Sequence, residues 1–177
     1  MNSNAGRYSA DIDFSRKIYF AILLLSLLWN LLIFTAPLLA GNEGLPSAIS
    51  DFLYVFFSKV CHQEDSRSFH FFGNKLGVCS RCVWMYAGFF TGTALYPLKY
   101  RINNTESPST IYLYAASALV LADVIGDLTG IIGNTFLSRS VTGFIIGAVL
   151  PFFLIPGFIK FFYEVNSFLK NKISYKN

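Results

Sequence analysis

The stretch that decides the fold is Ile18–Leu39, IYFAILLLSLLWNLLIFTAPLL, which contains no charged residue. A membrane-spanning helix needs about 20 predominantly apolar residues, and this stretch supplies them. Arg16 and Lys17 precede it, as in a signal peptide, but the apolar run exceeds the roughly 7–15 residues of a signal sequence and no small-residue cleavage site follows. The stretch is therefore predicted to be an uncleaved membrane helix.

The composition of the whole chain leads to the same class. Of the 177 residues, 54% are hydrophobic and only 14% are charged, whereas a soluble domain carries about 25% charged residues. A soluble fold of this size cannot bury so much apolar surface, and so apolar a chain does not stay disordered. Three cysteines are too few for a secreted disulfide scaffold. We expect a small integral membrane protein whose first partner is membrane lipid, with no nucleic-acid partner.

Three further apolar stretches are predicted to span the membrane, at residues 83–98, 111–133 and 141–162. Glycines four residues apart are typical of closely packed membrane helices, and two stretches contain such a pair: Gly88 with Gly92, and Gly143 with Gly147. The last stretch also contains Pro151 and Pro156, which are expected to kink it. We therefore expect an all-α membrane protein, a four-transmembrane-helix bundle in which residues 1–177 form a single integral membrane domain.

Residues 40–82 connect the first two predicted spans. Ser47 can cap a short helix, Ala48–Val60, because its side-chain oxygen accepts a free backbone N–H. That helix is rich in aromatic residues, so it is expected to lie at the membrane interface. The chain continues through Cys61-His62-Gln63, so the connection reads as an interfacial helix followed by a Cys/His loop.

The distribution of Lys and Arg predicts the orientation in the membrane. If both termini lie on one side, that side carries nine of the fourteen basic residues: Arg7, Arg16, Lys17, Lys99, Arg101, Lys160, Lys170, Lys172 and Lys176. The other side carries Lys59, Arg67, Lys75, Arg81 and Arg139. Cytoplasmic loops carry the excess of basic residues, so both termini are predicted to be cytoplasmic and segment 40–82 to face outward.

This topology places the unusual polar residues at one end of the bundle. Cys79 and Cys82 begin the second span, and Arg139 begins the fourth. Asp123 and Asp127 lie in the outer half of the third span, four residues apart and so on one helix face. An ionisable side chain within a membrane costs several kcal/mol by most estimates and is by default a functional candidate.

Cys61, His62, Cys79 and Cys82 supply three sulfurs and one imidazole, a common ligand set for structural zinc. His70 is the alternative imidazole. A zinc ion would hold the outer segment against the bundle and offset the entropy of ordering it. A disulfide or redox pair, and inert thiols, stay open as other interpretations of the same cysteines.

The redox interpretation rests on Cys79-Ser80-Arg81-Cys82 at a helix N-terminus, where the helix dipole and Arg81 lower a thiol pKa. A four-helix protein with this motif at the outer surface resembles the quinone-linked disulfide-forming proteins and the vitamin K epoxide reductases. Those families generally use a second cysteine pair, and here only Cys61 remains. A thiol–disulfide oxidoreductase with quinone as cofactor is therefore the alternative function.

Arg67, Arg81 and Arg139 match the geometry of phosphate or carboxylate, so they are candidates for binding an anionic or lipid substrate, together with Gln63. The two carboxylates, Asp123 and Asp127, would then be free for catalysis. The competing interpretation is that the arginines only neutralise these aspartates in buried pairs. The sequence leaves open whether the protein is an enzyme or a non-enzymatic structural or assembly subunit.

Several of these residues also carry a family resemblance. The resembling positions are Cys61-His62-Gln63, Arg67-Ser68-Phe69, Gly73, Val78-Cys79, Arg81-Cys82, Tyr86, Gly88, Asp123, Arg139, Thr142-Gly143 and Gly147. With them the chain resembles a bacterial membrane-protein family catalogued as domain of unknown function 2085. The resemblance implies a small multi-spanning protein of the bacterial cytoplasmic membrane without an established activity. The leading hypothesis is a zinc site at the outer membrane face beside an Asp/Arg pocket.

Overall fold

The computed structural model describes residues 12–174 and is almost entirely helical. Its elements, in chain order, are α1 (Ile12–Leu39), α2 (Leu45–Ser58), a 3-10 turn (Asp65–Arg67), β1 (His70–Phe71), β2 (Asn74–Lys75), α3 (Ser80–Lys99), α4 (Ile111–Leu128), α5 (Phe136–Val149) and α6 (Pro151–Ser174). Two basic residues of the orientation argument, Arg7 and Lys176, lie outside the described residues.

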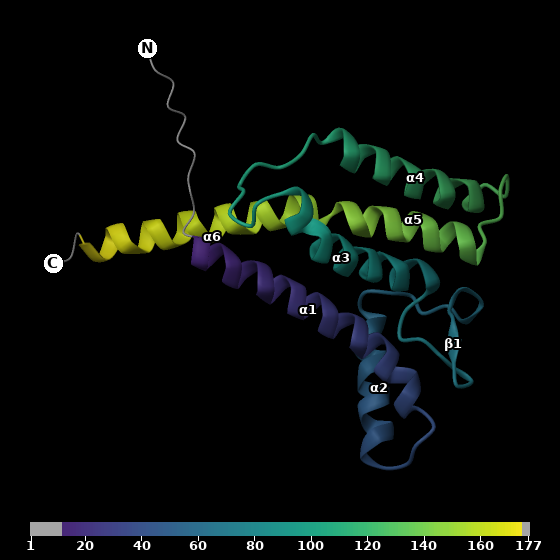
Figure 1. The fold of residues 1–177 in the computed structure, drawn as a ribbon. Helices are drawn as coiled ribbons and strands as arrows, with labels where there is room; N and C mark the ends of the chain where they lie inside the picture. The colour runs from purple at the N-terminus through teal and green to yellow at the C-terminus, as the bar shows by residue number, and fades with distance from the viewer. Residues whose placement is uncertain (1–11, 175–177) are drawn as a thin grey trace.

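Helix α3 lies at the centre of the arrangement (Figure 1). It packs against α5 on one side and α1 on the other, and α4 lies along the far side of α5. Helix α6 continues the direction of α5, while α2 crosses the end of α1. The end of the bundle where α3 and α5 begin and α4 ends is called the cysteine end below.

The contact between α3 and α5 is made by the two glycine pairs. A Cβ atom at any of the four positions would overlap backbone of the facing helix: Gly88 against Phe144, Gly92 against Ala148, Gly143 against Arg81, and Gly147 against Met85. Residue numbers increase together along this contact, so the two helices run parallel. The predicted close-packing role of the glycines is confirmed, and it brings the first turns of α3 and α5 to one end.

Three helical stretches within residues 12–174 are long and apolar enough to cross a membrane: Ile12–Leu39, Ile111–Leu128 and Phe136–Asn166, the last combining α5 with most of α6. Helix α3 has the length but not the hydropathy to join them. Its central position explains this, because much of its surface touches other helices rather than lipid. The four-span prediction is therefore supported for three spans, with α3 as a fourth helix held among them.

Several predicted boundaries were wrong. Helix α2 begins at Leu45, with Gly44 at the N-cap and no side-chain cap, so Ser47 lies inside the first turn and does not cap it. The third span ends at Leu128 and not at residue 133, because Gly130 adopts a φ of 70° that stops the helix. The predicted fourth span, 141–162, lies within the apolar stretch Phe136–Asn166. The helix is interrupted at Pro151, the first residue of α6, where a proline has no N–H to lose.

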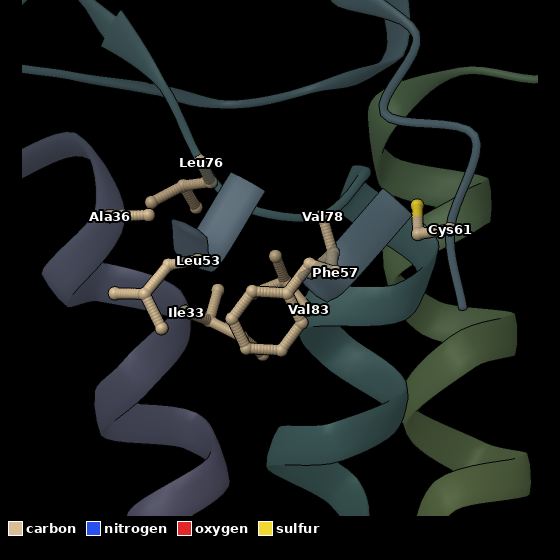
Figure 2. Packing of buried hydrophobic residues seen from close by; sticks show 8 residues of the cluster. All are labelled: Ile33, Ala36, Leu53, Phe57, Cys61, Leu76, Val78 and Val83. Carbon is tan, nitrogen blue, oxygen red and sulfur yellow. The ribbon is translucent and has the colours of Figure 1, made fainter. Parts of the chain in front are cut away.

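Two hydrophobic clusters hold the helices together. The first joins α1, α2 and the start of α3 and contains Ile33, Ala36, Leu53, Phe57, Cys61, Leu76, Val78 and Val83, with Cys61 at its edge (Figure 2). The second joins the start of α1, the end of α3 and α6, and contains Tyr19, Tyr96, Ile155 and Ile159. The first cluster fixes α2 and the loop after it, and so positions the first predicted site residue.

Candidate metal centre and polar pocket

The sulfur atoms of Cys61, Cys79 and Cys82 lie within 4.8 Å of one another. Cys61 follows α2, Cys79 is the N-cap residue of α3, and Cys82 lies in the first turn of that helix. All three are free thiols, Cys61 is buried, and the other two are partly buried. Three thiols at this separation can ligate one metal ion.

Backbone N–H groups point at the Cys61 sulfur. The N–H of Cys79 donates to it at 3.1 Å, and the N–H of Gln63 approaches it at 3.5 Å. Hydrogen bonds with the thiols of Cys79 and Cys82 lower the pKa of Cys61, and the two backbone donors act in the same direction. This surrounding stabilises a thiolate, which is the form that binds a metal.

Gln63 fixes the loop that carries Cys61. Its side-chain amide donates to the carbonyl of Tyr54 at 2.8 Å and to that of Gly77 at 2.7 Å, which ties the end of α2 to the segment leading into Cys79. Lys75 donates to the Gln63 carbonyl at 3.1 Å, and Gln63 itself has a φ of 52°. The side chain predicted to bind substrate is thus engaged with backbone, and it does not line the pocket described below.

A two-stranded hairpin in this loop was not predicted from the sequence. Strand β1 pairs antiparallel with β2, and the turn between them has positive φ at Phe72 (50°) and Gly73 (79°). Both central residues of a type I′ hairpin turn need positive φ, which glycine supplies readily and phenylalanine does not. In the Phe72-Gly73 turn only the glycine is a residue typical of this turn type, so the sequence did not indicate a hairpin.

The two histidines lie apart from the sulfur cluster. His62 is exposed and lines the neighbouring pocket, but its ring nitrogens are not in the group of atoms within 4.8 Å. His70 contacts the Asp65 carboxylate at 3.2 Å on the hairpin. The structure thus brings together three of the four predicted metal ligands.

The arginines and aspartates meet beside the cysteines, as the topology predicts. Arg81 of α3 binds the Asp123 carboxylate of α4 at 2.5 Å. Asp123 is only 11% exposed, so it faces the bundle and not the lipid. Asp127, one turn further on, lies 3.6 Å from Arg67 and 3.8 Å from Arg139, and its other oxygen accepts the N–H of Asn134 at 3.1 Å.

A pocket of about 380 Å³ joins the two groups. It is lined by Val60, Cys61, His62, Glu64, Arg67, Cys79, Arg81, Cys82, Val124, Asp127, Leu128, Asn134 and Arg139. The convergence of polar residues at the cysteine end is therefore confirmed. Asp123 is not among the lining residues. Its carboxylate pairs with Arg81, which does line the pocket.

Two residues in and near this pocket were not predicted from the sequence. Glu64 lines the pocket and binds Arg67 Nε at 3.1 Å, and Tyr54 donates its hydroxyl to the Lys75 carbonyl at 2.5 Å, which fastens the hairpin. The available signal for Glu64 was its place directly after Cys61-His62-Gln63. Tyr54 carried no such signal, because its role depends on the fold of a hairpin that the sequence did not predict.

Comparison with known proteins finds one matching family and two similar proteins. The profile of the family described as "Predicted membrane protein (DUF2085)" matches residues 61–165, which include all three cysteines and both aspartates. An uncharacterized protein of Methanocaldococcus jannaschii is 33% identical over 152 residues, covering 84% of this chain and 97% of its own. One from Methanothermobacter thermautotrophicus is 35% identical over 80 residues, covering 44% of this chain and 65% of its own.

No solved structure matches the chain. Both relatives are archaeal, so they do not support the bacterial source that the resemblance implied. The family profile covers more than half of the 177 residues, and the first relative is similar along nearly its whole length. The chain therefore belongs to the DUF2085 family of predicted membrane proteins.

Proposed function

We propose that this protein is a membrane metalloprotein that holds one Zn²⁺ ion through the thiolates of Cys61, Cys79 and Cys82. The observation that carries the proposal is the sulfur cluster itself, with its three sulfurs within 4.8 Å of one another. Bound zinc keeps its ligands about 2.3 Å from the metal, so the sulfurs need only a small inward shift. The two backbone N–H groups aimed at Cys61 favour the same ligand.

His62 is the proposed fourth ligand. It follows Cys61 directly, and its exposed ring makes no hydrogen bond or ion pair with residues 12–174. Turning this ring toward the sulfurs therefore breaks no hydrogen bond or ion pair. His70 is the weaker candidate, because it contacts Asp65 on the hairpin.

The pocket beside the metal is proposed to receive an anionic group of a lipid or of a small molecule. Arg67, Arg81 and Arg139 supply positive charge to its wall. Of the two predicted catalytic carboxylates, Asp127 lines the pocket and Asp123 does not, so Asp127 is the proposed catalytic group and Asp123 holds Arg81 in place. With both termini in the cytoplasm, as the basic residues predict, this pocket opens at the outer membrane face.

Cobalt substitution tests the metal site and its fourth ligand together. Co²⁺ bound by three thiolates gives intense sulfur-to-metal charge-transfer absorption and visible bands whose strength reports tetrahedral geometry. We expect these bands in the full-length protein in detergent, a changed visible spectrum in His62→Ala, and an unchanged one in the matched control His70→Ala. An unchanged spectrum in His62→Ala contradicts the assignment of His62 as the fourth ligand.

The same sample tests the alternatives. Absence of charge-transfer bands in fully reduced protein contradicts the metal proposal. Recovery of a reducible Cys79–Cys82 disulfide from membranes supports the thiol–disulfide oxidoreductase with quinone. A structural or assembly subunit predicts that Asp127→Asn alters stability alone, whereas a folded Asp127→Asn protein that has lost its cellular function argues for a reaction in the pocket.

A further inference from the structure

The pocket wall contains a largely buried guanidinium, that of Arg139, whose side chain makes an ion pair but no hydrogen bond within residues 12–174. The Arg139 side chain is 10% exposed, and within residues 12–174 its nearest carboxylate oxygen, Asp127 Oδ2, lies 3.8 Å away. That distance exceeds the length of a hydrogen bond. A guanidinium that lines a pocket and has only a long ion pair keeps N–H donors available for a further acceptor.

Arg67 approaches the same oxygen from the other side. Its NH2 group lies 3.6 Å from Asp127 Oδ2, and its Nε is engaged by Glu64 at 3.1 Å. Arg67 is 46% exposed, so it stands toward the mouth of the pocket while Arg139 lies deeper. One carboxylate oxygen therefore lies between two guanidinium groups, at ion-pair distance from both and beyond hydrogen-bond distance from both.

Arg81 shows what a matched pair looks like in the same wall. Its NH2 group meets Asp123 at 2.5 Å, so this arginine already has its anion. The contrast divides the three arginines into one with a short ion pair to an aspartate and two whose contacts with Asp127 are long. Arg67 and Arg139, the two with the long contacts, both line the pocket.

We propose that this space binds a phosphate group held by Arg67 and Arg139, which displaces the Asp127 carboxylate from between them. A phosphate offers several oxygens to two guanidinium forks at once, and its charge matches two arginines. Asp127 keeps its second oxygen on the Asn134 N–H, which anchors the carboxylate while Oδ2 moves away. This inference rests on the proposed function, because it names the substrate class of the same pocket.

The phosphate belongs either to a lipid headgroup or to a small free phosphate, and the two sources are separable by experiment. Inorganic phosphate is titrated into the purified full-length protein in detergent by calorimetry. In parallel, the protein is placed in nanodiscs of phosphatidylcholine with or without phosphatidic acid, and its thermal unfolding is compared. Binding in the first arm assigns a small phosphate, and stabilisation only in the second assigns a lipid.

Substitutions of Arg139 and Asp127 are expected to change the affinity for phosphate in opposite directions. Arg139→Gln lowers the affinity for the phosphate probe by about tenfold or more, and Arg139→Lys recovers only part of it, because the ammonium lacks the guanidinium fork. Asp127→Asn raises the affinity severalfold, since it removes the competing negative charge. Arg101→Gln, an exposed arginine beyond the far end of α3, leaves the affinity unchanged.

Three results overturn the inference: no response to phosphate in either arm, unchanged affinity in Arg139→Gln, or a loss in Asp127→Asn as large as in Arg139→Gln. Circular dichroism melting of each variant shows that the compared proteins are folded. Repeating the titration on Cys79→Ser separates the two proposals. Phosphate binding retained in this variant, which the metal proposal expects to be free of zinc, would show that the phosphate site does not depend on the metal. Wild-type protein that binds phosphate but holds no metal would leave this inference standing and remove the metal proposal alone.

Discussion

The two ends of the bundle bury side chains of opposite character. Where α1 begins and α3 ends, Tyr19 and Tyr96 pack with Ile155 and Ile159, and the Tyr19 hydroxyl donates to the Thr93 carbonyl at 3.1 Å. At the cysteine end, thiols, arginines and aspartates surround a pocket of about 380 Å³. At the apolar end, the helices of this chain pack together without buried charged side chains. Packing alone therefore does not require the arginines and aspartates at the cysteine end, which indicates that they serve a function.

The glycine contact between α3 and α5 connects the two ends, and breaking it has the largest expected effect. Gly147→Leu places a side chain against the Met85 backbone, which cannot move aside without separating the helices. We expect a cost above the roughly 1–3 kcal/mol typical of overpacking, and loss of the monodisperse folded protein in size-exclusion chromatography. Gly157→Leu is the matched control, because an added Cβ there meets no atom within 4 Å. Equal behaviour of the two variants would contradict the predicted role of the contact.

The sequence was sufficient to predict the features that depend on local pattern. The apolar run of α1, the glycine pairs, and the placement of Asp123 beside the α3 cysteines follow from hydropathy and alternating topology. Features that depend on a specific backbone angle were missed or misplaced: the end of α4 at Gly130 and the hairpin turn at Phe72. Residues in the left-handed region decide each, Gly130 for the helix end and Phe72 with Gly73 for the turn, and no periodic pattern marks them.

The sequence predicted which residues gather at the candidate site, but not which of them pair with one another. Topology alone assigns cysteines, arginines and aspartates to one end, because it depends only on which helix end each residue occupies. Pairing needs three-dimensional distances, which is why the difference between the short ion pair of Arg81 with Asp123 and the long one of Arg139 with Asp127 was not predicted. Gln63 was assigned to substrate for the same reason, since its carbonyl partners come from α2 and from the segment after the hairpin.

A substitution at the apolar end is expected to lower the stability of the protein and to leave metal binding unchanged. Ile159 is fully buried, and Ile159→Ala removes packing in the cluster of Tyr19 and Tyr96, at an expected cost of about 2–4 kcal/mol. Thermal or denaturant unfolding in detergent measures this loss, and the metal content per folded chain stays at the wild-type value. A variant that folds but loses its metal would show that the two ends are not independent.

A smaller effect is expected at the loop that holds Cys61. Gln63→Glu keeps the side-chain shape but removes both amide donors to the Tyr54 and Gly77 carbonyls. We expect about tenfold weaker zinc binding in a chelator competition assay, because supporting contacts around metal ligands contribute on the order of 10–100-fold in affinity. Asn74→Asp is the matched control, since Asn74 also donates an amide hydrogen to a backbone carbonyl, that of Pro37, but further from the sulfurs. Equal loss in both variants would assign Gln63 a general role in folding.

The central claim is that the cysteine end holds a metal through three thiolates, and metal content with thiol state on one sample tests it most directly. Full-length protein purified under reducing conditions is divided between elemental analysis and alkylation mass spectrometry. The account predicts one zinc per chain, three thiols protected from alkylation until a chelator is added, and loss of the zinc in Cys79→Ser. Reduced, folded protein without stoichiometric metal and with all three thiols freely alkylated would contradict it.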